Sequence, residues 1–289
     1  VYSSVTVAIT NINDAPSITS TPVTAVDEDA GYSYSITTGD VDPSDTITIT
    51  GTTVSWLTLN DGGDGTATLT GTPTNSDVGT QSYTLTVSDG TASTTQAFTI
   101  TITNTNDAPT VSSAISDAST AEDAAYSSDI SGNFADVDAS TTLTYSATGM
   151  PSTLTMSTAG VLSGTPVNAN VGTHSVVVTA SDGTATVSDT FVLTVINTND
   201  APVISSTPVT SVNEDAAYAY TTTASDDDGE TVTLTCTTVP LWMSCTSGVL
   251  TGTPANANVG THSVVITASD GTASVTDSFT VTVANTNDA

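Results

Sequence analysis

The sequence predicts an all-β protein built from tandem β-sandwiches, and three observations lead to that prediction. Short apolar segments alternate with Thr and Ser at every second position, as in SYTLTVS, FTITIT and SVVVTAS. This is the period of a strand with one buried face. No segment shows helical periodicity, and none is apolar for long enough to cross a membrane. The pattern also recurs about every 90 residues, which matches the size of a seven-stranded sandwich.

An Asn-x-Asn-Asp motif marks the repeat. It begins at Asn11, Asn104, Asn197 and Asn285, at intervals of 93, 93 and 88 residues. A unit of this length is a domain rather than one turn of a solenoid. We therefore expect the last strand and linker of a preceding or neighbouring repeat over residues 1–13. Three sandwiches are then expected over residues 14–106, 107–199 and 200–289, the third ending in a linker.

The same signals follow one another in each unit. An Asn-Asp-Ala-Pro linker is followed by Glu-Asp-Ala with a Tyr, by Asp-x-Asp, by a Gly-Thr-Pro turn and by a long strand ending in Ser-Asp-Gly. A final strand leads to the next linker. Three of the four glutamates, Glu28, Glu122 and Glu214, occupy one phase of this pattern. Turn formation could explain the Ser-Asp-Gly motif and part of Asp-x-Asp, but not the Glu residues, because Glu is not a turn residue.

The charge of the chain excludes several classes of partner. There are 30 acidic residues and no Lys or Arg, so nothing can neutralise a phosphate, and neither nucleic acid nor an anionic membrane is an expected partner. Uncompensated negative charges oppose compaction. The countercharge must come from solution, and a divalent hard cation is the natural candidate. The alternative is that the acidic surface serves only for solubility or adaptation to salt.

The order of Glu, Asp-x-Asp, Ser-Asp-Gly and Asn-x-Asn-Asp resembles that of the calcium-binding cadherin repeat. Stretches such as MPSTLTMSTAGVLSGTPVNANVGTHSVVVTASDGTATVSDTFVLTV resemble the dystroglycan-type, cadherin-like Ig repeats of bacterial surface adhesins and fibres. The resemblance covers essentially the whole chain. It implies tandem Ig/cadherin-like Greek-key β-sandwiches arranged end to end, with Ca²⁺ at the junctions. The chain lacks the LDRE-type element of animal cadherins, so one or two ions per junction are expected.

The resemblance also implies sets of ligands, whose carboxylate and amide oxygens suit Ca²⁺. The first complete junction would combine Glu28, Asn106, Asp107, Asp136, Asp138 and Asp182. The second would combine Glu122, Asn199, Asp200, Asp226, Asp228 and Asp270. Two incomplete sets remain, namely Asn13, Asp14, Asp40, Asp42 and Asp89 at one end, and Glu214, Asn287 and Asp288 at the other.

Residues 1–10, VYSSVTVAIT, align with the final strand of a repeat. An unpaired strand with an apolar face is a site of association. Either these residues belong to a longer array of similar repeats, or they complete the sandwich of a neighbouring molecule by strand addition. Both alternatives give head-to-tail partners.

Cys236 and Cys245 occur only in the third unit. A pair nine residues apart suits a short disulfide loop between adjoining strands, which would imply an oxidising, exported setting. Two buried free thiols are the alternative.

Other residues have ordinary structural interpretations. His174 and His262 share a position with Gln81, so we expect polar turn flanks rather than catalytic bases. Residues 61–65, DGGDG, are similar to a calcium loop, but only the first unit contains them, so a Gly-rich hairpin turn is expected. Trp56 and Trp242 are expected in the sandwich cores.

The sequence therefore predicts a secreted or surface-displayed, non-enzymatic repeat array, stiffened by calcium and serving as a stalk or filament body. An adhesive module that binds a glycan or a protein, and a filament subunit joined by strand exchange through residues 1–10, remain as alternatives. No catalytic or organic-cofactor motif recurs.

Overall fold

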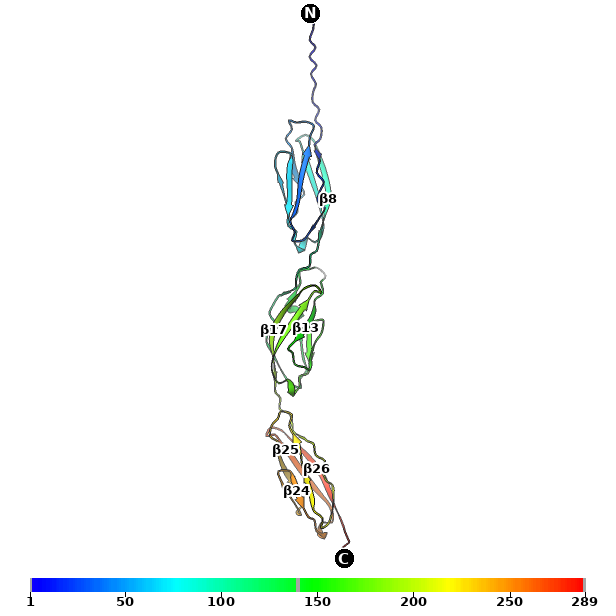
Figure 1. Ribbon diagram of the computed structural model, residues 1–289, viewed down its shortest axis with the longest axis vertical. Helices are drawn as coiled ribbons and strands as arrows, with labels where there is room; N and C mark the ends of the chain where they lie inside the picture. The colour runs from blue at the N-terminus through cyan, green and yellow to red at the C-terminus, as the bar shows by residue number, and fades with distance from the viewer. Residues whose placement is uncertain (1, 139–140, 288–289) are drawn as a thin grey trace. The chain divides into compact units, whose positions relative to one another are not determined.

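The computed structural model describes residues 2–138 and 141–287, and these ranges contain β-strands and four short 3₁₀ turns without any α-helix (Figure 1). The predicted all-β fold is confirmed. Within the same ranges no helix is long and apolar enough to cross a bilayer.

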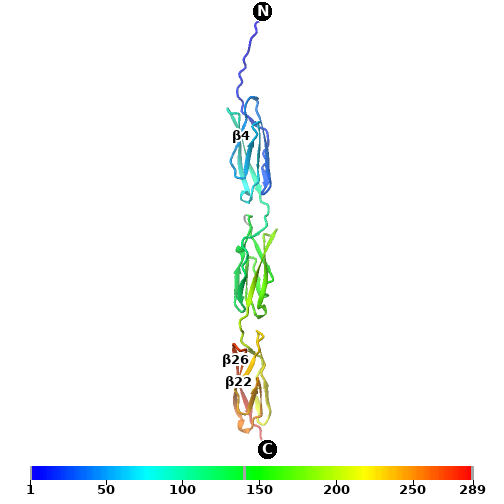
Figure 2. The same cartoon turned by 90° about the vertical axis from the view of Figure 1, so that its left-hand side faces the viewer.

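The first repeat contains two four-stranded sheets, ordered β1-β3-β6-β5 and β2-β8-β7-β4. Strand β4 forms one edge of the second sheet (Figure 2), and β2 runs parallel to the last strand, β8. The elements are β1 (Ser17–Ile18), β2 (Ala25–Asp27), β3 (Tyr32–Gly39), β4 (Thr48–Gly51), β5 (Leu57–Asp61), β6 (Thr66–Gly71), η1 (Asn75–Asp77), β7 (Gly79–Ser88) and β8 (Ser93–Thr103).

The second repeat has sheets ordered β10-β17-β16-β13 and β11-β15-β14, and a separate pair, β12-β9. Again the strand before the Glu-Asp-Ala site, β10, is parallel to the last strand, β17. The elements are β9 (Thr110–Val111), β10 (Ala118–Ala121), β11 (Tyr126–Asp129), η2 (Ser131–Asn133), β12 (Phe134–Ala135), β13 (Thr144–Thr148), β14 (Leu154–Met156), β15 (Val161–Gly164), η3 (Asn168–Asn170), β16 (Gly172–Ser181) and β17 (Thr186–Ile196).

The third repeat has sheets ordered β19-β26-β25-β22 and β20-β24-β23, with the pair β18-β21, and β19 is parallel to β26. Its elements are β18 (Val203–Ile204), β19 (Ser211–Asn213), β20 (Tyr218–Thr221), β21 (Ala224–Ser225), β22 (Thr233–Thr238), β23 (Met243–Thr246), β24 (Val249–Gly252), η4 (Asn256–Asn258), β25 (Gly260–Ser269) and β26 (Ser274–Ala284).

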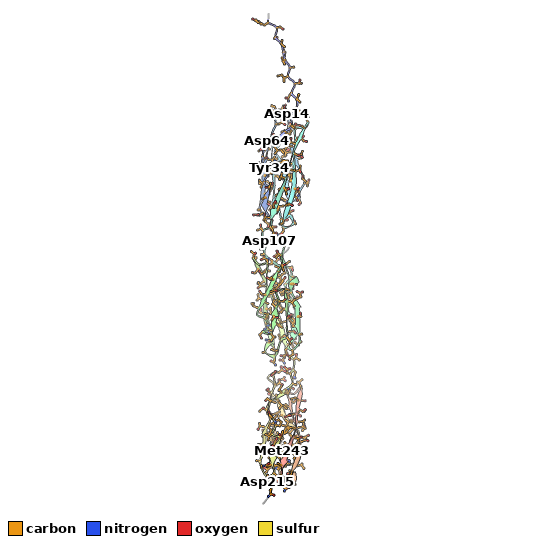
Figure 3. All side chains as sticks on the ribbon, turned by 90° about the vertical axis from the view of Figure 1, so that its right-hand side faces the viewer. Asp14, Tyr34, Asp64, Asp107, Asp215 and Met243 are labelled. Carbon is orange, nitrogen blue, oxygen red and sulfur yellow. A yellow bond between two sulfur atoms is a disulfide. The ribbon has the colours of Figure 1, made fainter. Side chains whose placement is uncertain are left out.

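The cores arise from the period-2 pattern. In β7 the side chains of Tyr83, Leu85 and Val87 are buried, while the Thr and Ser residues between them are more exposed. Strands β16 and β25 repeat this burial pattern position by position. Tyr34 also lies in the core of the first repeat (Figure 3). Because every second position faces the opposite sheet, the alternating segments seen in the sequence form the inner faces.

The Gly of the Gly-Thr-Pro turn is required by a close backbone approach. A Cβ at Gly71 would overlap the carbonyl oxygen of Trp56, and one at Gly252 would overlap that of Trp242. Both Trp rings pack edge-to-face on a core Tyr, with ring centroids 5.7 Å apart for Tyr32 and Trp56. The predicted core position of the two Trp residues is confirmed.

Cys236 and Cys245 form a disulfide. The bond joins β22 and β23, which are edge strands of the two different sheets of the third repeat. It therefore ties the layers of the sandwich together as well as adjoining strands. The predicted hairpin turn at residues 61–65 also forms, between β5 and β6.

Contacts group the chain into two compact units. The first contains Val1–Ser112, Phe134–Thr144 and Ala180–Val187, and the second contains Ser113–Asn133, Tyr145–Thr179 and Ser188–Ala289. The linker after β8 and the loops that it contacts thus belong to the first unit. The linker after β17 and the loops that it contacts belong to the second unit. The repeat boundaries given above stay predictions.

Candidate metal sites

The three in-phase glutamates are all buried, each with 2% of its surface exposed. Each one directly follows the short strand that runs parallel to the last strand of its repeat. The Glu N–H extends this ladder by donating to the last strand, from Glu28 to Thr103 O at 3.0 Å, from Glu122 to Ile196 O at 3.0 Å and from Glu214 to Ala284 O at 2.9 Å. The sheet thereby places each Glu beside the start of the linker.

One oxygen of each Glu side chain is bonded to that linker. Glu Oε1 accepts a backbone N–H from Thr105 at 2.6 Å, from Thr198 at 2.8 Å and from Thr286 at 2.6 Å respectively. The other oxygen, Oε2, is buried and has no hydrogen-bond partner in any of the three repeats. Because a buried carboxylate is costly without a partner and the chain has no Lys or Arg, a cation from solution is the partner that would satisfy it.

The Asp after each Glu holds the turn. Asp29, Asp123 and Asp215 have φ values of 58°, 55° and 60°, in the left-handed region that Asp tolerates better than most residues. Their N–H groups donate to carbonyl oxygens of the Gly-Thr-Pro turns, for example from Asp123 to Pro166 at 2.8 Å. This links the Glu-Asp-Ala and Gly-Thr-Pro motifs and fixes the direction of the Glu side chain.

Each Asp-x-Asp motif forms a local Asx turn, in which the first carboxylate accepts the N–H of the second Asp. The distances are 2.9 Å for Asp40–Asp42, 2.8 Å for Asp136–Asp138 and 2.9 Å for Asp226–Asp228. The second carboxylate then accepts the N–H of the linker Asp, from Asp14, Asp107 and Asp200 at 2.7, 2.9 and 2.7 Å. The turn interpretation therefore holds, but the turn also brings its carboxylates to the linker.

The Ser-Asp-Gly aspartates behave mainly as turn residues. One oxygen of Asp182 accepts the N–H groups of Thr184 and Ala185, and the other accepts the amide of Asn106 at 3.0 Å. Asp89 and Asp270 have the equivalent bonds, with Asn13 and Asn199 as the amide donors. The backbone N–H of the Ala three residues later, with the other donors, lowers the pKa of Asp89, Asp182 and Asp270.

At the first junction, one oxygen each from Glu28, Asp107 and Asp138 lie within 4.8 Å of one another. Asp107 lies on the linker (Figure 3), and Asp138 is only 7% exposed. Buried oxygens without partners occur on Glu28, Asp136 and Asp138. Three segments thus bring together three of the predicted ligands, two of which, Glu28 and Asp138, have unpaired oxygens. Such a donor set suits Ca²⁺.

At the second junction, a cluster of oxygens within 4.8 Å of one another comes from Asp226, Asp228 and Glu230. Glu230 was not among the predicted ligands, because it stands outside the phase of the other three glutamates. Desolvation, and then the charges of Asp270, Asp226 and Asp228, raise the pKa of Glu230.

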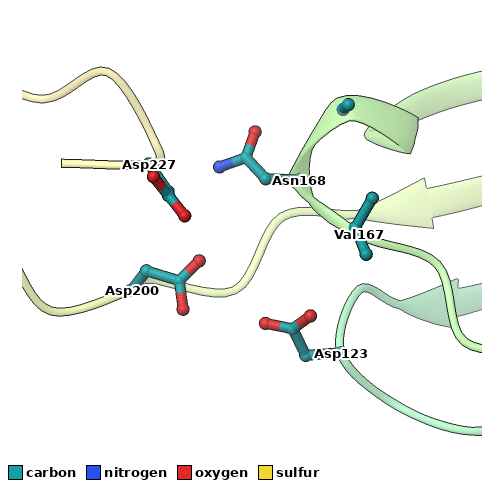
Figure 4. Close-up of a pocket in the computed structure, with 6 residues that line it drawn as sticks. Asp123, Val167, Asn168, Asp200 and Asp227 are labelled. Atoms are coloured by element: carbon teal, nitrogen blue, oxygen red, sulfur yellow. The ribbon is translucent and has the colours of Figure 1, made fainter.

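The second junction also has a pocket of about 490 Å³. Figure 4 shows the carboxylates of Asp123, Asp200 and Asp227 facing the same opening from three different segments. Asp123 and Asp227 were not predicted either. Desolvation is the largest cause that raises the pKa of Asp200, followed by the charges of Asp123 and Asp228 and then of Glu122 and Asp227.

Some residues of the two incomplete ligand sets also form hydrogen bonds with a linker. Asn11 donates its amide to Asp42 at 2.7 Å, which holds the linker before the first repeat, and Oδ2 of Asp40 is buried and unpaired. At the other end Glu214 bonds Thr286 as described, and Asn287 follows it. Asp288 lies outside the described residues.

Comparison with known families gives one match, which covers most of the chain. The family described as Putative Ig domain matches residues 15–103, 108–196 and 201–284. The comparison with curated proteins gave no match.

Solved structures with tandem domains are similar to this chain. A protocadherin gammaB7 EC3-6 cis-dimer structure has a TM-score of 0.52 at 14% identity, covering 93% of this chain and 77% of that one. The protocadherin GammaB4 extracellular domain has a TM-score of 0.50 at 16% identity, covering 96% and 52%. An endo-fucoidan hydrolase from glycoside hydrolase family 107 has a TM-score of 0.35 at 26% identity. This chain covers 45% of that protein, and 96% of this chain is matched. The protocadherin likeness concerns the fold alone.

Proposed function

We propose a calcium-dependent structural role for this chain, which belongs to the Putative Ig domain family and folds as tandem Ig-like, cadherin-like repeats. Calcium binds at the two complete junctions and holds each linker against the loops on either side of it. The repeats then act as a non-catalytic stalk or filament body of an extracellular adhesin or fibre. The disulfide of the third repeat supports an exported, oxidising location.

The observation that carries this proposal is the unpaired Oε2 of Glu28, Glu122 and Glu214. Each oxygen is buried beside a linker, in a chain with no basic side chain other than two His. Such an arrangement is unfavourable on its own and becomes favourable when a cation is bound. The predicted ligand sets of the two junctions are part of this proposal.

The test compares calcium with a chelator. Thermal unfolding and small-angle scattering of the whole chain are measured first in about 1 mM CaCl₂ and then in EDTA. This calcium concentration is about equal to the Kd of the weakest extracellular Ca²⁺ sites. We expect a higher Tm and a larger maximum dimension in calcium. Asp64→Asn is the matched control, because Asp64 is an exposed hairpin residue at the opposite end of the first repeat from Asp107 (Figure 3). Identical curves for the wild type in both solutions would reject the calcium role.

The exposed apolar side chains of residues 2–10 favour a further repeat as their partner. Val7 and Ile9 are 76% and 92% exposed, whereas the residues at the equivalent positions of the three last strands are 0–2% exposed. These equivalents are Ile100, Ile102, Leu193, Val195, Val281 and Val283. We propose that residues 2–10 form the last strand of another sandwich, in a longer array or in a second copy.

Sedimentation velocity distinguishes these two sources. If the strand pairs with a second copy, the full chain associates with increasing concentration, and removal of residues 1–10 abolishes this. If the chain stays monomeric with and without these residues, strand exchange is excluded and the strand belongs to a longer array.

An adhesive face that binds glycans has less support. Among the described residues Tyr2 is the one exposed aromatic side chain, since Trp56 and Trp242 pack against the cores. Stacking on a sugar would need such a surface.

A further inference from the structure

The last strand of the third repeat has an open edge over most of its length. Strand β25 pairs with β26 from Ser274 to Val283 (Figure 1), whereas β19, on the other side, pairs only with residues 282–284. Residues 274–281 of β26 therefore have no strand on that side. A strand edge of this kind can accept a further extended segment.

In the first repeat, side chains close the equivalent edge of β8. They connect it to the entering segment, which we define as the residues between a linker and the short parallel strand, namely 16–24, 109–117 and 202–210 in the three repeats. Gln96 donates its amide to Ser20 O at 3.2 Å and accepts the hydroxyl of Tyr34 at 3.0 Å. Thr94 donates its hydroxyl to Pro16 O.

In the second repeat, two carboxylates connect β17 to the entering segment. Asp189 occupies the position of Gln96 and accepts the N–H of Ile115 at 2.7 Å. From the entering segment, Asp117 accepts the N–H of Val192 at 2.7 Å. The edge of this last strand is thus partly covered as well.

The third repeat lacks such bonds. Asp277 stands at the position of Gln96 and Val275 at that of Thr94. The Val275 side chain has no polar group, and the carboxylate of Asp277 has no hydrogen bond to the residues that the structure describes. Nothing therefore holds the entering segment against this part of β26.

A groove of about 400 Å³ lies between the entering segment of the third repeat and the start of β26. Its walls are mainly apolar and include Val203, Pro208 and Val275, together with the carboxylate of Asp277. Val203 is 60% exposed and Val275 36% exposed. The groove thus offers apolar contact area beside a strand edge.

The groove also has an unused hydrogen-bond donor beside it. Ser206, which lines the groove, is bonded to the Tyr220 hydroxyl at 2.8 Å and accepts the Thr223 N–H at 2.9 Å. In the first repeat the equivalent Tyr34 hydroxyl donates onward to Gln96. In the third repeat, one hydroxyl hydrogen of the Ser206–Tyr220 pair has no acceptor within the described ranges, although Tyr220 is only 5% exposed. A carbonyl group in the groove would supply that acceptor.

We propose that this groove binds an extended segment of a basic partner protein, which adds to the free edge of β26 and pairs a Lys or Arg with Asp277. Apolar side chains of the segment pack on Val203 and Val275, and its backbone amides replace the amide of Gln96 in the first repeat. The charge selects the partner, because Asp277 is half-buried and this chain has no Lys or Arg to pair with it. A second copy is disfavoured, since residues 1–10 carry no charge and two chains of net charge −30 repel each other.

The experiment measures binding of a synthetic peptide, TVTKTVTVT, to the whole chain by fluorescence anisotropy. In this peptide the Lys and the Val residues lie on one face of a strand. The solution contains EDTA and about 0.15 M NaCl, which screens unspecific attraction, so the result does not depend on the calcium role. We expect saturable binding, about tenfold weaker binding of the same peptide with Glu in place of Lys, and amide chemical-shift changes confined to residues 202–210 and β26.

Two variants test the groove itself. Asp277→Asn should weaken binding of the Lys peptide about tenfold, because it removes the charged partner. Val275→Thr with Asp277→Gln gives the third repeat the residues of the first, and it should abolish binding by closing the groove. Asp64→Asn removes one charge in the first repeat and should leave binding unchanged. The amide spectrum of each variant verifies that it is folded.

Three outcomes would overturn the proposal. The first is equal binding of the Lys and Glu peptides, or no binding of either. The second is unchanged binding to the double variant, which would mean that the peptide is attracted by the acidic surface in general. The third is binding in the groove by a peptide of residues 1–10 but not by the Lys peptide, which would make a second copy of the chain the occupant.

Discussion

The buried carboxylate of Glu28 is only half satisfied, because one oxygen accepts a hydrogen bond from the linker while the other has no partner. Glu28→Gln keeps an acceptor for the Thr105 N–H and removes the charge. In chelator we expect the variant to be more stable than the wild type, because it no longer buries an uncompensated charge. In calcium we expect it to be less stable, by about 1–3 kcal/mol.

Chemical unfolding in EDTA and in calcium measures this reversal of sign. Asp64→Asn serves again as the control and should show the same small effect in both solutions. A Glu28→Gln variant that is destabilised equally in both would mean that Glu28 has a purely structural role.

A second prediction at the residue scale concerns pH. The Ala185 N–H and its neighbouring donors lower the pKa of Asp182 below the usual value of an Asp side chain. A carboxyl whose pKa is lower in the folded state stabilises the fold above its unfolded pKa, and this contribution is lost as pH falls through the folded value. In chelator, stability should therefore decline below about pH 4, and less steeply in Asp182→Asn. Parallel pH profiles for the two proteins would contradict this.

At the scale of the element, the disulfide joins edge strands β22 and β23 of opposite sheets. Its loss lets the two layers of the third repeat separate at that edge, and it increases the conformational entropy of the unfolded chain. We expect the double variant Cys236→Ala with Cys245→Ala to lose about 2–3 kcal/mol of stability in the third repeat. Native-state hydrogen exchange should show faster exchange in β22–β25 and unchanged exchange in the first repeat. Equal loss of protection in all repeats would be inconsistent with a local role.

The elements were largely predictable because the alternating pattern and the turn residues agree with each other. The inward residues of β7, β16 and β25 can be identified from the sequence by counting every second position. Residues 2–10 were predicted as a strand from the same pattern, yet they form none here. A strand needs a neighbour for its backbone groups, and no segment of the described chain pairs with this one.

The site was predictable only where it repeats. Glu28, Glu122 and Glu214 were identified from their common phase, and all three turned out to be buried beside a linker. Asp123, Asp227 and Glu230 were missed, since Asp227 and Glu230 occur in one repeat alone and the Asp of the Glu-Asp-Ala motif was given no role. Their importance depends on which loops lie next to each other, and residue spacing contains no information about that.

At the scale of the whole molecule, a net charge of −30 opposes folding of the free chain. In chelator we expect Tm to rise as NaCl increases from about 0.05 to about 0.5 M, because the Debye length shortens well below about 10 Å. In saturating calcium the rise should be smaller, since bound ions have already neutralised the densest clusters. Differential scanning calorimetry in the four conditions measures both effects. An equal response to NaCl with and without calcium would mean that the ions do not neutralise these clusters.

The division of each site among three segments affects how such a gene can change in length. Every repeat supplies a Glu to the linker that follows it and an Asp-x-Asp loop to the linker that precedes it. Recombination between equivalent positions of two repeats therefore rebuilds a complete site. Deletion of residues 104–196 would join Thr103 to Asn197 and place Glu28 beside the linker that Glu122 now contacts. Repeat number can thus vary through unequal crossing-over, with no intermediate that lacks a junction.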